Sequence, residues 1–263
     1  MSVTSVGQYI SDGLALALII RLLALRLHSV YRVFCAFLIV DLFSSLAFLV
    51  EKFVHLPLDY RLTWMTLRPA IWILCLWMVY ALLDAMLANL PGILRISRKL
   101  LNFAFLAALI LAFFTGLPEY YASSLSGSSS ALARGVGATF VIERVIFMAA
   151  VLVLLAILAF ILWFPVQMPR NLAVFSVGFV VYFSTITALL LMNTYWPGTD
   201  LRLVSDIATF TLAGCYTYWL IFINHAGETR PVRMGHSWGP AEQQRLIGEL
   251  EAMNAALLRA SRR

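Results

Sequence analysis

Charged residues are scarce in this sequence. Only 12% of its 263 residues are charged and 62% are of hydrophobic types, and the mean hydropathy is +0.89. About a quarter of the residues of an ordinary soluble domain are charged, so this chain has too little polar material to cover a surface facing water. The apolar residues also come in blocks of about twenty, the length that a helix needs to cross a bilayer. We therefore expect an integral membrane protein.

Lysine, histidine and cysteine are also scarce, and their positions exclude several cofactors. Both lysines, Lys52 and Lys99, lie at the ends of apolar blocks, which excludes a retinal Schiff base in the last block. The four histidines lie at or beyond block ends and no HExxH motif occurs, so neither a bis-histidine haem nor a catalytic zinc site is expected. The three cysteines lie inside apolar blocks, where they are typical of small buried residues. We expect no cofactor and no metal.

Catalytic constellations are missing as well. Ser44, Ser45, Ser184 and Ser205 lie inside apolar blocks, but no histidine or lysine accompanies them there as a base. The net charge of +6 is carried mostly at block ends and in the tail, where it indicates contact with anionic lipid headgroups rather than with nucleic acid. We expect a non-enzymatic protein with no catalytic residues.

The apolar blocks predict an all-α membrane protein with a seven-helix transmembrane bundle. The blocks are continuously apolar and lack the alternation of barrel strands. Residues 1–225 would form the bundle, residues 226–238 a polar linker, and residues 239–263 a cytoplasmic amphipathic helix. The spans are expected at about 10–29, 33–53, 63–90, 100–117, 140–164, 171–193 and 203–224.

Lysine and arginine near the block ends predict the orientation of the chain. The odd-numbered connections and the tail carry eight of these residues and the even-numbered connections carry four. By the positive-inside rule the N-terminus lies outside and the C-terminus in the cytoplasm. The long loop expected at 118–139 is rich in serine, as an external loop often is, and residues 1–12 lack the positive charge of a signal peptide. Together with the compact loops, this favours the inner membrane of a bacterium.

Two parts of the sequence resemble each other faintly. Residues 43–46 read Phe-Ser-Ser-Leu and residues 183–186 read Phe-Ser-Thr-Ile. A proline followed by an aspartate and an arginine then occurs in both 57–62 and 197–203. Two three-helix units, spans 1–3 and 5–7, joined by the fourth span would produce this pattern, and such parallel repeats occur in transporters. Chance similarity among common membrane residues is the alternative.

The tail is predicted to contain one amphipathic helix. Pro240 suits the first helical position and Glu242 the positive N-terminal end. One apolar stripe follows, and three roles compete for it: binding to anionic lipid, pairing with itself or a partner helix, and no contact at all. The stripe comprises Leu246, Leu250, Met253 and Leu257.

Several ionisable residues lie inside the predicted spans, where each needs a partner or water. Arg21 and Asp41 lie at similar distances from the expected inner ends of spans 1 and 2, so we expect an intramembrane ion pair between them. This pair would fix helix packing or serve in a proton or ion relay. Asp84, near the inner end of span 3, is within reach of Arg26 or Arg95.

A second charged group is expected in the outer half of the bundle. Arg68, Glu143, Arg144 and Asp206 would all lie near the outer boundary, with Tyr195 and Trp196 above them. Two positive and two negative groups on three helices would suit a pocket for a small polar ligand, and they would equally suit a structural salt-bridge network. We consider these four residues the candidate ligand-binding site.

By elimination, the sequence favours a membrane receptor or sensor module that binds a small polar ligand in the outer half. One alternative is a small membrane carrier, or a transporter subunit, built from the two three-helix repeats. Another is a structural subunit of a larger membrane complex. Besides the lipid bilayer, a second copy of the chain is a candidate partner.

Overall fold

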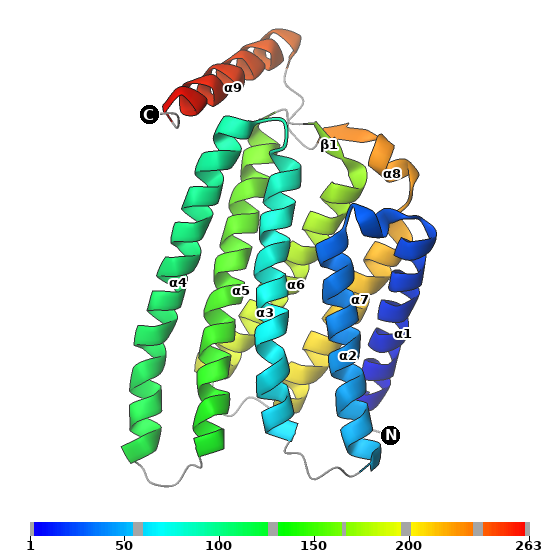
Figure 1. The fold of residues 1–263 in the computed structure, drawn as a ribbon, viewed down its shortest axis with the longest axis vertical. Helices are drawn as coiled ribbons and strands as arrows, with labels where there is room; N and C mark the ends of the chain where they lie inside the picture. The colour runs from blue at the N-terminus through cyan, green and yellow to red at the C-terminus, as the bar shows by residue number, and fades with distance from the viewer. Residues whose placement is uncertain are drawn as a thin grey trace.

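The computed structural model describes residues 3–54, 60–125, 131–164, 167–195, 201–233 and 239–260, and this part of the chain is nearly all helical. Seven long helices run side by side, and a further helix lies across one end of them (Figure 1). We call that end the tail end and the opposite end the far end. The long helices are α1 (Val3–Ala24), α2 (Arg32–Val54), α3 (Tyr60–Met86), α4 (Pro91–Leu125), α5 (Ala131–Trp163), α6 (Arg170–Tyr195) and α7 (Leu201–Phe222).

Four helices in the described part of the chain are long and apolar enough to cross a membrane, namely α1, α3, α5 and α6. Large apolar side chains also lie exposed along the outside of the bundle, among them Ile73, Phe103 and Leu152. Such side chains are favourable against lipid tails and costly in water. The expectation of a helical membrane protein is confirmed at this level.

Six of the long helices form a closed ring. α1 packs on α2, α2 on α3, α3 on α5, α5 on α6, α6 on α7, and α7 again on α1. α4 lies outside this ring, mainly against α5, and Figure 1 shows it at the edge of the bundle. The interior is therefore enclosed by α1–α3 and α5–α7.

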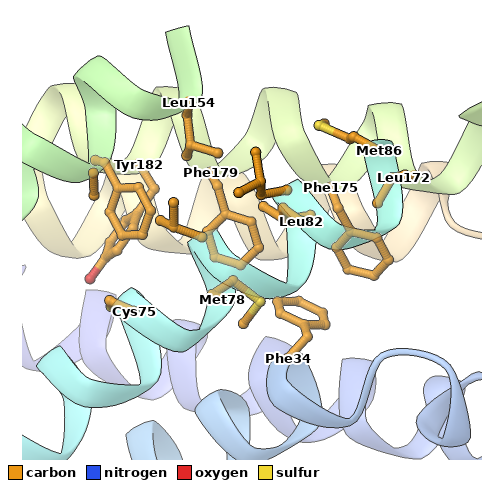
Figure 2. Packing of buried hydrophobic residues seen from close by; sticks show 14 of the residues in the cluster. Phe34, Cys75, Met78, Leu82, Met86, Leu154, Leu172, Phe175, Phe179 and Tyr182 are labelled. Carbon is orange, nitrogen blue, oxygen red and sulfur yellow. The ribbon is translucent and has the colours of Figure 1, made fainter. Parts of the chain in front are cut away.

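Aromatic rings fill much of the interior between α2, α6 and α7. The ring of Phe34 meets that of Phe175 edge to face at 4.7 Å, and the ring of Phe179 lies 4.7 Å from that of Trp219. Figure 2 shows Phe34, Phe175 and Phe179 gathered with apolar side chains of α3 and α5. Aromatic pairs of this kind contribute about 1 kcal/mol each beyond their burial.

Gly178 allows α6 and α7 to approach closely. A side-chain carbon at this position would overlap the indole ring of Trp219. The Sγ atom of Cys215 on α7 also lies 3.6 Å from the Gly178 carbonyl oxygen. Helices in membranes associate through such contacts between small and large residues, because exclusion of water contributes little there.

The helix bounds differ from the predicted spans at several places. The first span was expected to reach residue 29, but α1 ends at Ala24, where Arg26 adopts a left-handed conformation (φ 54°) before the short 3₁₀ helix η1 (Leu27–Ser29). The loop expected at 118–139 is largely helical, because α4 continues to Leu125 and α5 begins at Ala131. Hydropathy locates the apolar part of a helix, and both helices extend beyond that part.

Residues 226–233, the described part of the predicted linker 226–238, form regular structure. They contain α8 (Ala226–Thr229) and the strand β2 (Pro231–Arg233), which pairs antiparallel with β1 (Gln167–Pro169) in the connection between α5 and α6. This pairing, between residues distant in the sequence, joins the tail to the bundle.

A buried hydrogen-bond network secures α8 to the same end of the bundle. The fully buried Asn171 side chain donates to the Asn224 carbonyl oxygen (2.8 Å) and to Glu228 Oε2 (3.3 Å). The Tyr31 hydroxyl donates to the same Glu228 oxygen at 2.7 Å. Burial, together with this contact to Glu228, raises the pKa of the Tyr31 phenol, so that Tyr31 keeps its proton and remains a donor.

The predicted tail helix is present as α9 (Pro240–Ala260), and it packs against the bundle itself. Leu250 from its apolar stripe is buried in the main core, whereas Met253 is exposed. The Asn254 side-chain oxygen accepts hydrogen bonds from the backbone N–H groups of Gly92 (2.6 Å) and Ile93 (3.2 Å). Asn254 thus satisfies two of the free N–H groups at the start of α4.

Replacing Asn254 by alanine should loosen this contact, because α4 begins after Leu90, whose apolar side chain cannot serve as a cap. By analogy with other lost N-caps, the expected cost is about 1 kcal/mol. Hydrogen exchange of purified protein should then be faster along α9 and at Gly92 and Ile93. Asn254→Asp keeps the acceptor oxygen and is the matched control. Equal protection of both segments in Asn254→Ala and the unmodified protein would contradict the proposed cap.

Candidate functional site

An ion pair joins α3 and α5 in the far half of the bundle. Arg68 Nη1 lies 3.1 Å from Glu143 Oε1, and the Glu143 side chain is only 4% exposed whereas Arg68 is 30% exposed. A carboxylate buried to this extent requires a partner, and Arg68 supplies it. The structure thus brings together two of the four residues of the predicted ligand site.

Two aromatic side chains flank this ion pair. The Arg68 guanidinium carbon lies 5.1 Å above the centre of the Trp64 ring, within the range of a cation–π contact. The Trp64 ring in turn lies 5.0 Å from that of Phe140 on α5. Trp64 and Phe140 lie one turn further toward the far end than Arg68 and Glu143. The pair is therefore covered by aromatic rings on that side.

Two buried polar atoms near the pair have no hydrogen-bond partner among the described residues, namely Trp72 Nε1 and Thr187 Oγ1. Trp72 lies one turn after Arg68 on α3, on the same face of the helix. The rings of Phe147 on α5 and Phe183 on α6 stack at 5.5 Å. Glu143 lies one turn before Phe147 and Thr187 one turn after Phe183. Because α5 and α6 run antiparallel, both residues lie one turn further toward the far end, so Thr187 is level with Glu143. Such unpaired groups are rare in protein interiors.

The other two predicted site residues lie on different helix faces. Arg144 follows Glu143 directly, about 100° around α5 at 3.6 residues per turn, and is half-buried. Asp206 lies one turn before Thr209 and Phe210 on α7, the residues that adjoin Gly7 of α1. Asp206 is therefore placed at the α1–α7 contact, where its Oδ1 atom is buried and has no hydrogen-bond partner within the described ranges. Tyr195 and Trp196 were predicted to lie above this group, but their side chains are outside the described part of the chain.

The predicted ion pair between Arg21 and Asp41 is absent from the ion pairs among the described residues. Arg21 instead donates to the Ile223 carbonyl oxygen at 3.0 Å. The reason is depth: Arg21 lies three residues before the end of α1, whereas Asp41 lies nine residues after the start of α2. At about 1.5 Å per residue, their backbones differ by about 9 Å along the bundle.

Asp41 has a tyrosine as its partner. The Tyr216 hydroxyl on α7 donates to Asp41 Oδ2 at 2.7 Å, and Tyr216 is fully buried. One turn further along α2, the Ser45 hydroxyl oxygen accepts a hydrogen bond from Gln8 Nε2 at 2.6 Å, and Gln8 also donates to Asp12 Oδ1 at 3.2 Å. These contacts connect polar groups of α1, α2 and α7 in the middle of the bundle.

The polar groups of all six ring helices form one set, which we call the central polar group. The charges of Asp12 and Arg68 act on Asp41, and those of Asp41, Arg68 and Glu143 act on the buried Tyr182 hydroxyl of α6. Low polarity around these groups makes their mutual interactions strong. The central polar group comprises Asp12, Asp41, Arg68, Glu143, Tyr182 and Tyr216.

Asp84 belongs to a different part of the molecule. Its carboxylate accepts two hydrogen bonds of 2.8 Å from Arg98 at the start of α4. Both side chains are well exposed, at 40% and 51%, so the pair contributes little to stability. Arg26 or Arg95 was the expected partner of Asp84, but its carboxylate binds Arg98 in the structure.

Sequence reasoning missed Asp12, Tyr182, Tyr216 and Thr187. Tyrosine and threonine are common in membrane helices and carry no formal charge, so nothing in the composition marks them. Asp12 precedes the main apolar run of the first block and was taken as part of the N-terminal segment. A helical projection of α1 would have marked it, since Gln8 and Asp12 lie one turn apart on one face.

Removing one member of the Arg68–Glu143 pair should destabilise the protein more than removing both. Arg68→Gln leaves a buried carboxylate unpaired, with an expected loss of roughly 3 kcal/mol in the free energy of unfolding. Glu143→Gln should also destabilise, while the double variant should recover part of the loss. Unfolding of the purified variants in mild detergent measures this. Additive losses in the double variant would show that the two side chains do not interact.

Comparisons with known proteins leave the site to be interpreted from its own chemistry. No family model matches the chain, and neither a curated protein nor a solved structure matches it. The fold and the ion pair therefore carry the functional inference, together with the unpaired polar atoms beside it.

Proposed function

We propose that the protein is a membrane receptor or sensor module that binds a small polar ligand beside the Arg68–Glu143 pair. The observation that carries this proposal is that two buried polar atoms, Trp72 Nε1 and Thr187 Oγ1, have no hydrogen-bond partner among the described residues and lie next to the ion pair of the buried Glu143. Leaving a buried polar atom unpaired costs about 1–3 kcal/mol. A ligand that engages these atoms would recover that free energy.

The site offers both signs of charge and an aromatic surface. Arg68 is partly exposed and uses one nitrogen for Glu143, so its other N–H groups are placed to bind an acceptor on the ligand. The indole N–H of Trp72 is a second donor and the Thr187 hydroxyl serves either role. Trp64 and Phe140 supply an apolar wall. Such a combination suits recognition of a small polar molecule.

We further propose that all seven long helices span the membrane, with the far end outside and the tail end in the cytoplasm of a bacterial cell. The alternating course of the helices in Figure 1 and the excess of arginine near the tail end support this. The ligand site would then face the outside. The tail helix α9 would lie in the cytoplasm, where its contact with α4 provides an output.

Labelling of single introduced cysteines tests this orientation. In sealed right-side-out vesicles, an impermeant maleimide should label Ser128→Cys at once and Gly239→Cys only after the vesicles are opened. The unmodified protein is the control, because its three cysteines lie within helices. The opposite labelling order would reverse the orientation and place the ligand site on the cytoplasmic side.

Ligand binding should raise the unfolding temperature of the purified protein. We would screen small amino acids, carboxylates and amines, because a compound present at a hundredfold excess over its Kd stabilises by about 2.7 kcal/mol. The shift should disappear in Arg68→Gln. It should persist in the matched control Arg98→Gln, which removes an arginine from the exposed pair at the tail end. A shift that survives in Arg68→Gln would place the site elsewhere.

The carrier function remains the second candidate, and the ring of six helices favours it. The contacts α1–α2, α2–α3 and α3–α5 correspond to α5–α6, α6–α7 and α7–α1. This is the arrangement that two parallel three-helix repeats related by an axis along the membrane normal would give, with α4 as their connection. Uptake by sealed vesicles containing the purified protein distinguishes the two functions, because a receptor binds the ligand without moving it.

A further inference from the structure

The centre of the bundle contains more carboxyl groups than positive groups. In the described part of the chain, the ionisable groups that act on one another there are Asp12, Asp41 and Glu143 on one side and Arg68 on the other. With all four ionised, two negative charges would lack compensation. An uncompensated charge at bilayer depth is costly, so further positive charge at this place would stabilise the folded protein.

Asp41 and Asp12 are the two of these carboxyl groups that take part in none of the ion pairs among the described residues. Glu143 has Arg68 as its ion-pair partner, and Asp12 accepts a hydrogen bond from the neutral Gln8 amide. Asp41 takes part in none of the ion pairs among the described residues, and its hydrogen-bond partner is the neutral Tyr216 hydroxyl. Asp41 and Asp12 thus both have neutral hydrogen-bond partners, and Asp41 is the one bonded to a fully buried side chain, Tyr216.

The groups that face Asp41 from the helices around it add little positive charge. Arg68 is the positive group among them, and Glu143 already uses it. The remaining groups are acids, hydroxyls and a thiol, which are negative or neutral. They comprise Asp12 from α1, Cys75 from α3, Tyr182 from α6 and Tyr216 from α7.

A proton fits this place better than a metal ion. The described residues bring together no group of three or more metal-binding side chains. A protonated Asp41 can still accept the Tyr216 hydrogen bond through Oδ2 and gains a donor of its own.

We propose that Asp41 is a proton-binding site inside the bundle, which exchanges its proton with the far side through the Ser45 hydroxyl and the Asp12 carboxyl group, which Gln8 holds together. Ser45 lies one turn from Asp41 on α2, and Gln8 connects it to the half-buried Asp12. The step forms an O–H bond on the Asp41 carboxylate, breaks one in a hydronium ion and transfers no electrons. It depends neither on the ligand site nor on transport.

Infrared difference spectroscopy of the protein in lipid nanodiscs tests this site. In a pH titration around neutrality, the unmodified protein should show the carbonyl stretch of a protonated carboxylic acid above the amide I band. The band should vanish in Asp41→Asn, which keeps the size of the side chain and an acceptor for Tyr216. It should remain in the matched control Asp84→Asn, because that carboxylate lies in the exposed pair with Arg98.

Tyr216→Phe provides a second variant in case Asp41→Asn does not fold. It removes the donor to Asp41, so the band should move to higher frequency and should not disappear. The proposal is overturned if no acid band at any pH depends on Asp41 or Tyr216. It is also overturned if Asp41 stays ionised throughout and its carboxylate bands respond to sodium ions, since a metal cation would then supply the positive charge.

Discussion

The close approach of α6 and α7 at Gly178 is the contact on which the centre of the bundle depends. Trp219 lies against the backbone of α6 because Gly178 has no side chain, and it also meets Phe34 of α2. Three helices are thereby fixed around one indole ring. Tyr216 lies one turn before Trp219, so the same contact brings its hydroxyl within reach of Asp41. Apolar packing therefore sets the geometry of the polar interior.

The two polar regions of the molecule differ in how completely they are paired. At the tail end, Asn171 binds the backbone of Asn224 and the side chain of Glu228, and β1 pairs with β2. These contacts give the Asn171 amide and the backbone groups of β1 and β2 their hydrogen-bond partners, and they join the segment after α7 to the bundle. In the middle and far half, the central polar group contains three carboxyl groups and one positive group among the described residues. Buried polar atoms without a partner among the described residues occur in both halves, for example Trp72 Nε1 in the far half and Trp219 Nε1 toward the tail end, so the excess of carboxyl groups is what distinguishes the centre.

Hydropathy and charge position predicted the relative depth of Arg68 and Glu143 but not that of Arg21 and Asp41, and they did not predict the direction in which side chains face. Arg68 and Glu143 were expected at one level in one half of the bundle, and they form an ion pair. The Arg21–Asp41 pair was wrong because the apolar run continues past the end of α1, and composition does not mark the left-handed turn at Arg26. Asp206 lies at the predicted depth but on another face of its helix. The cap that Asn254 gives α4 joins residues 162 positions apart, and no local pattern encodes such a contact.

The position of that cap has a mechanical consequence. α4 is 35 residues long, or about 50 Å, and it packs along α5 on the outside of the ring. Its first turn is bound to Asn254 of α9, so any rotation of α4 relative to the ring would have this end as its pivot. A rotation of about 5° at the pivot displaces the far end by about 4 Å, given a rise of 1.5 Å per residue. Conversely, a shift of a few ångströms at the far end reaches α9 as a small change of angle.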